Sequence, residues 1–357
     1  MRAVVYRGVN DLRLETVPVP RIGPNELLVK VAVCGVCPTD IKKIQYGTVP
    51  PPRIFGHETA GVISKLGSGV SKLGWKIGDR VALHHHVPCL KCHFCRHHAF
   101  AQCATYKRTG ITAGFQPAGG GYAEYVRVLP FVLPGVVKIP AKNSFAEGAM
   151  LEPVNTVLKA VRRLSLLRGD VVLVAGQGPI GLIFTRLLQL AGAQVIATDL
   201  LEPRLRLARK FGARRVCLAT QLSTLNPQPS LDAAVIAVPS DAAVQQALQL
   251  VRGAGQVLLF AHTKRFAPEG GTQRSHFSLQ PLAFSLDLAS ICLDEKDLLG
   301  SYSSDFTLQD EVARLVFSRQ LDVRRLITHR FPLAQTAGAV ALAAHPKPDS
   351  LKILVIS

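Results

Sequence analysis

A strand, a glycine turn, a helix and a second strand follow one another over residues 171–199, and this segment limits the fold more than any other. The apolar run VVLVA comes first, then the turn at residues 176–181, the amphipathic helix IGLIFTRLLQLAG, and a strand that ends at Asp199. This succession is a βαβ unit, whose two strands are parallel. Further apolar strands alternate with helical segments up to about residue 261. The sequence therefore predicts an α/β fold with a doubly wound parallel sheet.

The turn GQGPIG has the glycine spacing of a dinucleotide-binding site, and it lies between a strand and a helix as that motif requires. Gly176 and Gly178 permit a tight turn and a close approach of the backbone to a pyrophosphate, and Gly181 permits the helix to pack on the strand. The helix N-terminus at Pro179 and Ile180 adds a positive partial charge. We therefore expect these five residues to bind a dinucleotide.

The end of the second strand indicates which dinucleotide is bound. Asp199 lies eighteen residues beyond Gly181, where a carboxylate accepts hydrogen bonds from both ribose hydroxyls and repels a 2′-phosphate. No arginine directly follows Asp199 to bind a 2′-phosphate, but Arg204 in the next helical segment could reach one. We expect both residues to contact the cofactor, which we predict to be NAD, with NADP as the less favoured alternative.

The remainder of the chain has a different pattern. Residues 1–150 contain many short strands separated by Gly and Pro, which is typical of a small all-β barrel or sandwich. From about Leu298 the pattern is mixed again, and the chain ends in the apolar strand LKILVIS. A length of 357 residues suits two domains, each with its own core.

Composition restricts the partners of the protein. The formal net charge of +18 favours anionic ligands, but no block of five like charges is present, so we expect no nucleic-acid partner. No apolar run approaches the roughly 18 residues that a membrane span needs. The first residues lack the apolar core of a signal peptide. We therefore expect a cytoplasmic protein without a membrane partner.

Four of the eight cysteines form one run, PCLKCHFCRHHAFAQC, with the spacing C-x2-C-x2-C-x7-C. Short gaps let neighbouring thiolates converge on one cation, and the longer arm closes a tetrahedron. A disulfide framework and an iron–sulfur cluster are the alternatives. We predict a structural zinc site, closed to water and substrate because all its ligands are thiolates, formed by Cys89, Cys92, Cys95 and Cys103.

A second set of potential metal ligands is spread along the chain. Cys37 stands in VCGVCPTDIKKI, His57 and Glu58 follow in GHETAGVI, and Glu152 opens LEPVNTVLKA. A thiolate, an imidazole and a carboxylate are the ligands of a zinc site that keeps one position open. Either glutamate can be the direct ligand while the other is an outer anchor. Asp40 is expected to orient Cys37 or to hydrogen-bond His57.

Taken together, these motifs resemble the zinc-containing medium-chain dehydrogenase family of alcohol, polyol and threonine dehydrogenases. The resemblance covers nearly the whole chain and includes Cys37-x-Thr39-Asp40, the Gly-His-Glu and Glu-Pro pairs, the cysteine run, the glycine turn and the late LLGSYSS. It implies a GroES-like catalytic domain with a structural zinc lobe at residues 1–152, a Rossmann NAD-binding domain at 153–299, and a return to the catalytic domain at 300–357.

The resemblance also implies an activity. Cys37, His57 and either Glu152 or Glu58 would hold the catalytic zinc, and the Thr39 hydroxyl would pass on the proton of the substrate alcohol. With glutamate at position 152, the chain resembles the polyol, threonine, butanediol and glucose dehydrogenase branch of the family. We therefore expect a zinc-dependent oxidoreductase that transfers hydride between a secondary alcohol and NAD, assembled as a homodimer or homotetramer.

Several alternatives remain at this point. Within the same branch, a threonine 3-dehydrogenase-like or cyclitol dehydrogenase activity is possible. A zinc-free quinone or enoyl reductase would lack the ligand set. A non-catalytic, basic nucleotide-binding relative would explain the charge. The three histidines at 84–86 are not expected to form a metal site, because neighbours on a strand point to opposite faces.

Overall fold

The computed structural model describes residues 1–84, 87–108, 119–224, 231–261 and 287–357. The chain forms two compact units, one of residues 1–159 with 302–357 and one of residues 160–301. In the described part of the chain, we find no helix of the length and apolarity that a membrane crossing demands.

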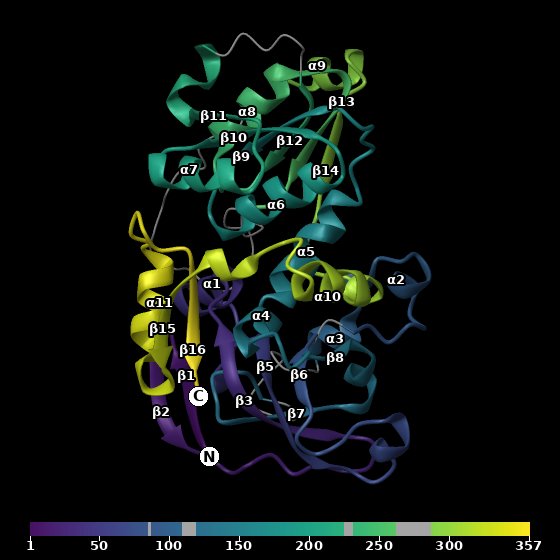
Figure 1. The fold of residues 1–357 in the computed structure, drawn as a ribbon, viewed down its shortest axis with the longest axis vertical. Coiled ribbons are helices and arrows are strands. Elements are labelled where there is room, and N and C mark those ends of the chain that lie inside the picture. The colour runs from purple at the N-terminus through teal and green to yellow at the C-terminus, as the bar shows by residue number, and fades with distance from the viewer. Residues whose placement is uncertain (85–86, 109–118, 225–230, 262–286) are drawn as a thin grey trace, which may run out of the picture. The chain divides into compact units, whose positions relative to one another are not determined.

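Residues 160–301 contain a six-stranded parallel sheet in the order β11-β10-β9-β12-β13-β14 (Figure 1). This order places β9, the first of these six strands along the chain, in the middle of the sheet, which is the arrangement of a Rossmann fold and confirms the predicted doubly wound sheet. The strands are β9 (Val171–Ala175), β10 (Gln194–Asp199), β11 (Arg215–Leu218), β12 (Leu231–Ile236), β13 (Val251–Leu259) and β14 (Asp297–Gly300).

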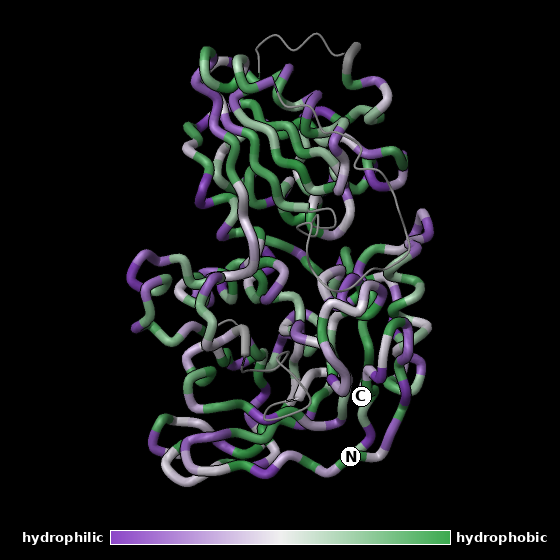
Figure 2. The backbone as a smooth tube through the Cα atoms, turned by 180° about the vertical axis from the view of Figure 1, so that it is seen from behind, coloured by the Kyte–Doolittle hydropathy of each residue, from purple (hydrophilic) through white to green (hydrophobic). Residues whose placement is uncertain are grey.

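Every residue of β9 is buried, because helices cover both faces of the sheet. Figure 2 shows the central strands of this sheet as predominantly hydrophobic. The elements that pack on these strands are α6 (Pro179–Leu190), α7 (Glu202–Lys210), α8 (Asp241–Leu250) and the 3₁₀ turn η4 (Ala219–Thr224). Helix α9 (Leu288–Leu293), which has no buried residue, precedes the last strand.

One strand of this sheet was not expected from the sequence. We predicted alternating strands and helices up to about residue 261 and a mixed pattern from about Leu298, but residues 297–300 form β14 and pair in parallel with β13. The strand is short, lies at the sheet edge and is mostly exposed, so it lacks the continuous apolar run that marks the inner strands.

The other unit is built on two antiparallel-rich sheets and joins both ends of the chain. The larger sheet has the order β15-β16-β3-β5-β6-β8, with β7 also paired to β3, and the smaller one has the order β2-β1-β4. The C-terminal strand pairs directly with β3. The strands are β1 (Arg2–Gly8), β2 (Asp11–Thr16), β3 (Leu27–Gly35), β4 (Arg53–Ile54), β5 (Glu58–Leu66), β6 (Arg80–Leu83), β7 (Tyr125–Val128), β8 (Val136–Lys138), β15 (Ile327–Pro332) and β16 (Lys352–Ile356).

Short helices connect these strands. Most important for function is α1 (Pro38–Tyr46), which has proline in its first turn and ends at Gly47 in the left-handed conformation (φ 62°). The others are α2 (His93–Arg96), α3 (Ala104–Arg108), α4 (Phe145–Ala149), α5 (Leu151–Val161), α10 (Gln309–Phe317) and α11 (Thr336–Ala344), with 3₁₀ turns η1 (Val70–Leu73), η2 (Phe100–Gln102), η3 (Pro130–Gly135), η5 (Phe306–Leu308), η6 (Val323–Leu326) and η7 (Leu333–Gln335).

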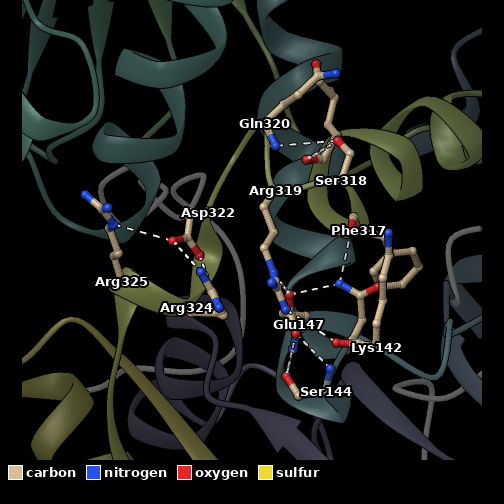
Figure 3. A network of polar contacts seen from close by, with 12 residues as sticks. Lys142, Ser144, Glu147, Phe317, Ser318, Arg319, Gln320, Asp322, Arg324 and Arg325 are labelled. Atoms are coloured by element: carbon tan, nitrogen blue, oxygen red, sulfur yellow. Dashed lines mark hydrogen bonds and ion pairs between the residues drawn. The ribbon is translucent and has the colours of Figure 1, made fainter.

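A polar network ties the start of α4 to the end of α10 (Figure 3). Ser144 and Glu147 form a capping box, in which each side chain accepts a hydrogen bond from the backbone N–H of the other. The Glu147 carboxylate also accepts from Asn143 Nδ2 at 2.9 Å and lies 3.3 Å from Arg319 Nε. Asn143 in turn donates to the Phe317 carbonyl. The network therefore links segments that are far apart in the sequence.

Candidate active site and cofactor pocket

The four clustered cysteines lie within bonding range of a single metal ion. Their ligand atoms are all within 4.8 Å of one another. The Sγ atoms of Cys92 and Cys95 are 3.4 Å apart, and those of Cys89 and Cys95 are 4.0 Å apart. Thiolates at about 2.3 Å from zinc in a tetrahedron would be separated by roughly 3.8 Å. The cysteines are not joined as disulfides, which removes that alternative.

These thiols differ in acidity because their surroundings differ. Backbone N–H groups, that of Lys91 foremost, lower the pKa of Cys89 to about 6. Desolvation raises the pKa of Cys95 to about 12. Such a mixed set suits a site that a metal completes, since a bound cation keeps every ligating thiol deprotonated.

A second cluster brings together Cys37, His57 and Glu58, whose ligand atoms also lie within 4.8 Å of one another. Cys37 is the residue that precedes the first turn of α1, Glu58 is the first residue of β5, and His57 directly precedes that strand. The meeting of these segments results from the pairing of β3 with β5, which places Gly35 opposite Glu58. The cluster thus combines the three ligand types expected from the sequence.

Asp40 holds the imidazole of this cluster. Its Oδ2 lies 3.2 Å from His57 Nδ1 and accepts the backbone N–H of Gly56 at 3.2 Å. Asp40 is completely buried, and although desolvation alone would raise its pKa, His57 lowers it. Conversely, desolvation opposes but Asp40 and Cys37 raise the pKa of His57. Because Nδ1 faces Asp40, Nε2 is the ring nitrogen that remains to bind a metal.

Lys352 contacts the cluster and was not expected from the sequence. Its Nζ contacts both carboxylate oxygens of Glu58 and donates to the Val36 carbonyl at 3.0 Å. Desolvation alone would lower the pKa of this lysine, yet Glu58 and then Cys37 raise it. The only signal in the sequence is a lysine inside the otherwise apolar terminal strand LKILVIS.

Glu152 lies on α5 and is buried, but it is outside the three-residue cluster. Desolvation, with a further contribution from Glu58, raises its pKa to about 7, against the opposing effects of His57 and Lys352. Its electrostatic interactions with His57 and Glu58 place it in the surroundings of the cluster. Thr39 is half-buried in the first turn of α1, two residues beyond Cys37.

The glycine turn has the backbone geometry that its motif requires. Gly176 has a φ of 91°, which favours glycine, and a Cβ at Gly181 would overlap the Gly176 carbonyl. A Cβ at Gly178 would meet nothing within 4 Å, so space is open beside the turn. Gly178, Pro179 and Ile180 are partly exposed at the N-terminus of α6, where free N–H groups attract an anion.

A cavity of about 410 Å³ lies beside this turn, within residues 160–301. Asp199 and Arg204 both line it, together with Ser240 and Gln246. Backbone N–H groups of Gln177 and Leu201 donate to the Asp199 carboxylate at 2.6 and 2.9 Å. Arg204 Nη1 is 3.8 Å from the same carboxylate. Such a cavity, at the carboxyl ends of parallel strands, is where a doubly wound sheet binds its ligand.

Of the three consecutive histidines, only His84 is in the described part of the chain. It is fully buried, and its Nε2 is 3.5 Å from Ser304 Oγ. His85 and His86 lie outside the described residues.

Known proteins match this chain along its whole length. Residues 23–141 match the alcohol dehydrogenase GroES-like domain, and residues 179–317 match the zinc-binding dehydrogenase domain. Sorbitol dehydrogenase of Bombyx mori is 30% identical over 370 residues, covering 99% of this chain and 97% of that protein. Alcohol dehydrogenase TADH from Thermus sp. ATN1 is 27% identical with a TM-score of 0.81, covering 100% and 99%. A dehydrogenase from Sinorhizobium meliloti 1021 bound to NADP is 26% identical with a TM-score of 0.83 and the same coverage.

The two domain matches define the class: a dehydrogenase that joins a GroES-like domain to a dinucleotide-binding sheet. The chain belongs to the zinc-containing medium-chain dehydrogenase family. This confirms the resemblance seen in the sequence motifs.

Proposed function

We propose that this protein is a zinc-dependent dehydrogenase that transfers hydride from a secondary alcohol of the polyol, diol or amino-alcohol type to NAD. The observation that carries this proposal is the convergence of Cys37, His57 and Glu58, with Asp40 against the imidazole. The same chain has a dinucleotide turn beside a cavity that Asp199 and Arg204 line.

The residues fit two zinc ions, one in a closed structural site and one in an open site. Four thiolates at tetrahedral separations suit a closed structural zinc, and the Cys37 cluster supplies three ligand types and leaves one position open. Zinc bound there would supply a Lewis acid that polarises the alcohol oxygen. We propose Glu58 as the direct carboxylate ligand, because it shares the cluster, and Glu152 as the outer carboxylate.

The remaining roles belong to side chains of the chain itself. Thr39 would accept the proton of the alcohol and pass it outward. Asp40 fixes the ring of His57. Asp199 would accept hydrogen bonds from the ribose hydroxyls, which favours NAD, although Arg204 in the same cavity offers a contact for the 2′-phosphate of NADP.

The substrate class follows from the relatives, since sorbitol dehydrogenase is a polyol enzyme by its name. We further propose a homodimer or homotetramer that acts in the cytoplasm, where unpaired thiols such as those of this chain persist. We expect no nucleic-acid partner.

A substrate screen on protein of measured zinc content tests this function. Purified protein is assayed with sugar alcohols, 2,3-diols, cyclitols and threonine, with NAD and with NADP, and cofactor reduction is followed by absorbance. We expect about two zinc ions per chain, turnover of at least one such alcohol, and a higher kcat/KM with NAD. Cys37→Ser should remove one zinc and abolish turnover.

Other outcomes would favour the alternatives. Zinc-free protein that reduces a quinone or an enoyl compound would point to the zinc-free branch. Tight, salt-sensitive DNA binding without turnover of any alcohol would point to the non-catalytic relative.

A further inference from the structure

Lys352 and Glu58 reach each other across an intervening strand. The three neighbouring strands are β16, β3 and β5, in that order, and the pair stands on the two outer ones. On the middle strand, Gly35 is opposite both Glu58 of β5 and Leu354 of β16. Lys352 lies two residues before Leu354 and therefore on the same face of β16. The ion pair thus forms over the one residue of β3 that has no side chain.

The absence of a side chain at Gly35 is necessary for this contact. A Cβ at Gly35 would overlap the Glu58 carboxylate, and it would lie 3.0 Å from Cε of Lys352. Gly35 does not have a positive φ, so backbone conformation is not the reason for glycine here. The glycine instead provides space for the two charged groups.

Both members of the pair are nearly inaccessible to solvent. Glu58 is 1% exposed and Lys352 is 5% exposed. Two buried charges are costly unless they compensate each other and satisfy their remaining hydrogen bonds. Lys352 does both, because it contacts the carboxylate and also donates to the Val36 carbonyl, next to Cys37. A buried ion pair beside potential metal ligands acts on the ligand geometry as well as on stability.

We propose that Lys352 is a positioning residue, which holds the Glu58 carboxylate at the Cys37–His57 cluster in the orientation that binds the metal, and that Gly35 provides the space for it. This inference rests on the proposed function, since it assumes a metal at the cluster. It extends that function to the C-terminal strand, which contributes no metal ligand of its own.

Metal retention by variants of the full chain tests the proposal. Protein is loaded with zinc, challenged with a graded chelator, and its metal content is measured, with the four-cysteine site as the internal reference. We expect Lys352→Met to weaken zinc at the Cys37 cluster by about 10- to 100-fold and to leave the four-cysteine site unchanged. Cobalt substituted at the cluster should show altered visible absorption in the same variant.

Gly35→Ala is a second variant that keeps both charges. Its methyl group displaces the flexible end of Glu58, so we again expect a loss of about 10- to 100-fold in zinc affinity. This variant tests the proposal even if Lys352→Met does not fold because Glu58 is left buried and unpaired. As a control, Arg127→Met removes the ion pair with Glu26 (2.6 Å) elsewhere in the same unit, and it should lower stability without loss of zinc.

A double-mutant cycle separates positioning from a general effect. If Lys352 acts through Glu58, then Lys352→Met should cause no further loss of zinc affinity in a Glu58→Gln background. Additive losses, or wild-type zinc retention in both Lys352→Met and Gly35→Ala, would overturn the inference. If the wild-type protein binds no metal at the Cys37 cluster, the proposed function itself fails, which is a different result.

Discussion

At the scale of single residues, the two later glycines of the dinucleotide turn have different tasks. Gly181 is required for packing, because a methyl group there would overlap the Gly176 carbonyl. Gly178 borders open space, so a methyl group there would disturb nothing in the protein itself. We infer that Gly178 is glycine so that a ligand can approach the backbone closely.

Alanine at each position should separate these tasks. Gly181→Ala should lower the free energy of unfolding by about 1–3 kcal/mol, because overpacking forces the helix from the strand. Gly178→Ala should cost no more than about 1 kcal/mol but should weaken NAD binding by roughly tenfold or more, a loss of at least about 1.4 kcal/mol. Chemical denaturation and NAD titration measure the two effects. Normal NAD affinity in Gly178→Ala would contradict a pyrophosphate site at this turn.

At the scale of elements, the capping box of α4 shows how one carboxylate stabilises several segments. Glu147 is 2% exposed and accepts hydrogen bonds from Ser144 and Asn143 while facing Arg319. Desolvation would raise its pKa, but these donors lower it below the ordinary value of 4.5. A carboxyl whose pKa is depressed by folding stabilises the folded state above its unfolded-state pKa, and this contribution is lost as pH falls through the folded-state pKa.

Glu147→Gln should therefore be less stable than the wild type near pH 7, by about 1–3 kcal/mol. The difference should shrink as pH falls below about 4.5, because the wild-type carboxyl becomes protonated. Denaturant unfolding across this pH range measures the difference between the two proteins. The control Glu124→Gln, at a more exposed ion pair with Arg2, should change stability by at most about 1 kcal/mol. A difference that grows on acidification would contradict this assignment.

At the scale of the whole molecule, the two proposed metal ions should be separable. The four cysteines belong to a short lobe between β6 and β7, whereas Cys37, His57 and Glu58 are held by β3, α1 and β5. The glycine turn lies in the other compact unit. Loss of the lobe metal should therefore leave the cofactor pocket intact.

Cys95→Ser should reduce the zinc content from about two ions per chain to about one. We expect faster proteolysis within residues 88–108 and unchanged NAD affinity, because the ligands alone hold the lobe while the cofactor turn is held by its own sheet. Metal analysis, limited proteolysis and NAD titration check these points. Cys292→Ser, at an exposed cysteine that belongs to neither cluster, is the control and should retain both zinc ions. Loss of both metals in Cys95→Ser would show that the sites are not independent.

Local sequence patterns predicted much of the fold and part of the candidate site of this protein. The βαβ unit, its glycine turn and the cysteine run are each contiguous, so the sequence alone predicts a doubly wound sheet, a dinucleotide turn and a four-thiolate site. Hydrophobic periodicity and the spacing of metal ligands extend over a few residues, so they can be recognised without knowledge of the fold. The edge strand β14 was not predicted, because a short exposed strand has neither a continuous apolar run nor a marked alternation of apolar and polar residues.

The contacts between distant segments were decided by the tertiary structure. The sequence suggested Cys37, His57 and two glutamates as ligands, but only the pairing of β3 with β5 brings Glu58, and not Glu152, into the three-residue cluster. Lys352 reaches that cluster only because β16 returns from the end of the chain to pair with β3. A buried charge needs a partner of opposite charge, and that partner can come from any strand that the fold places beside it. No local sequence pattern indicates which strand this is.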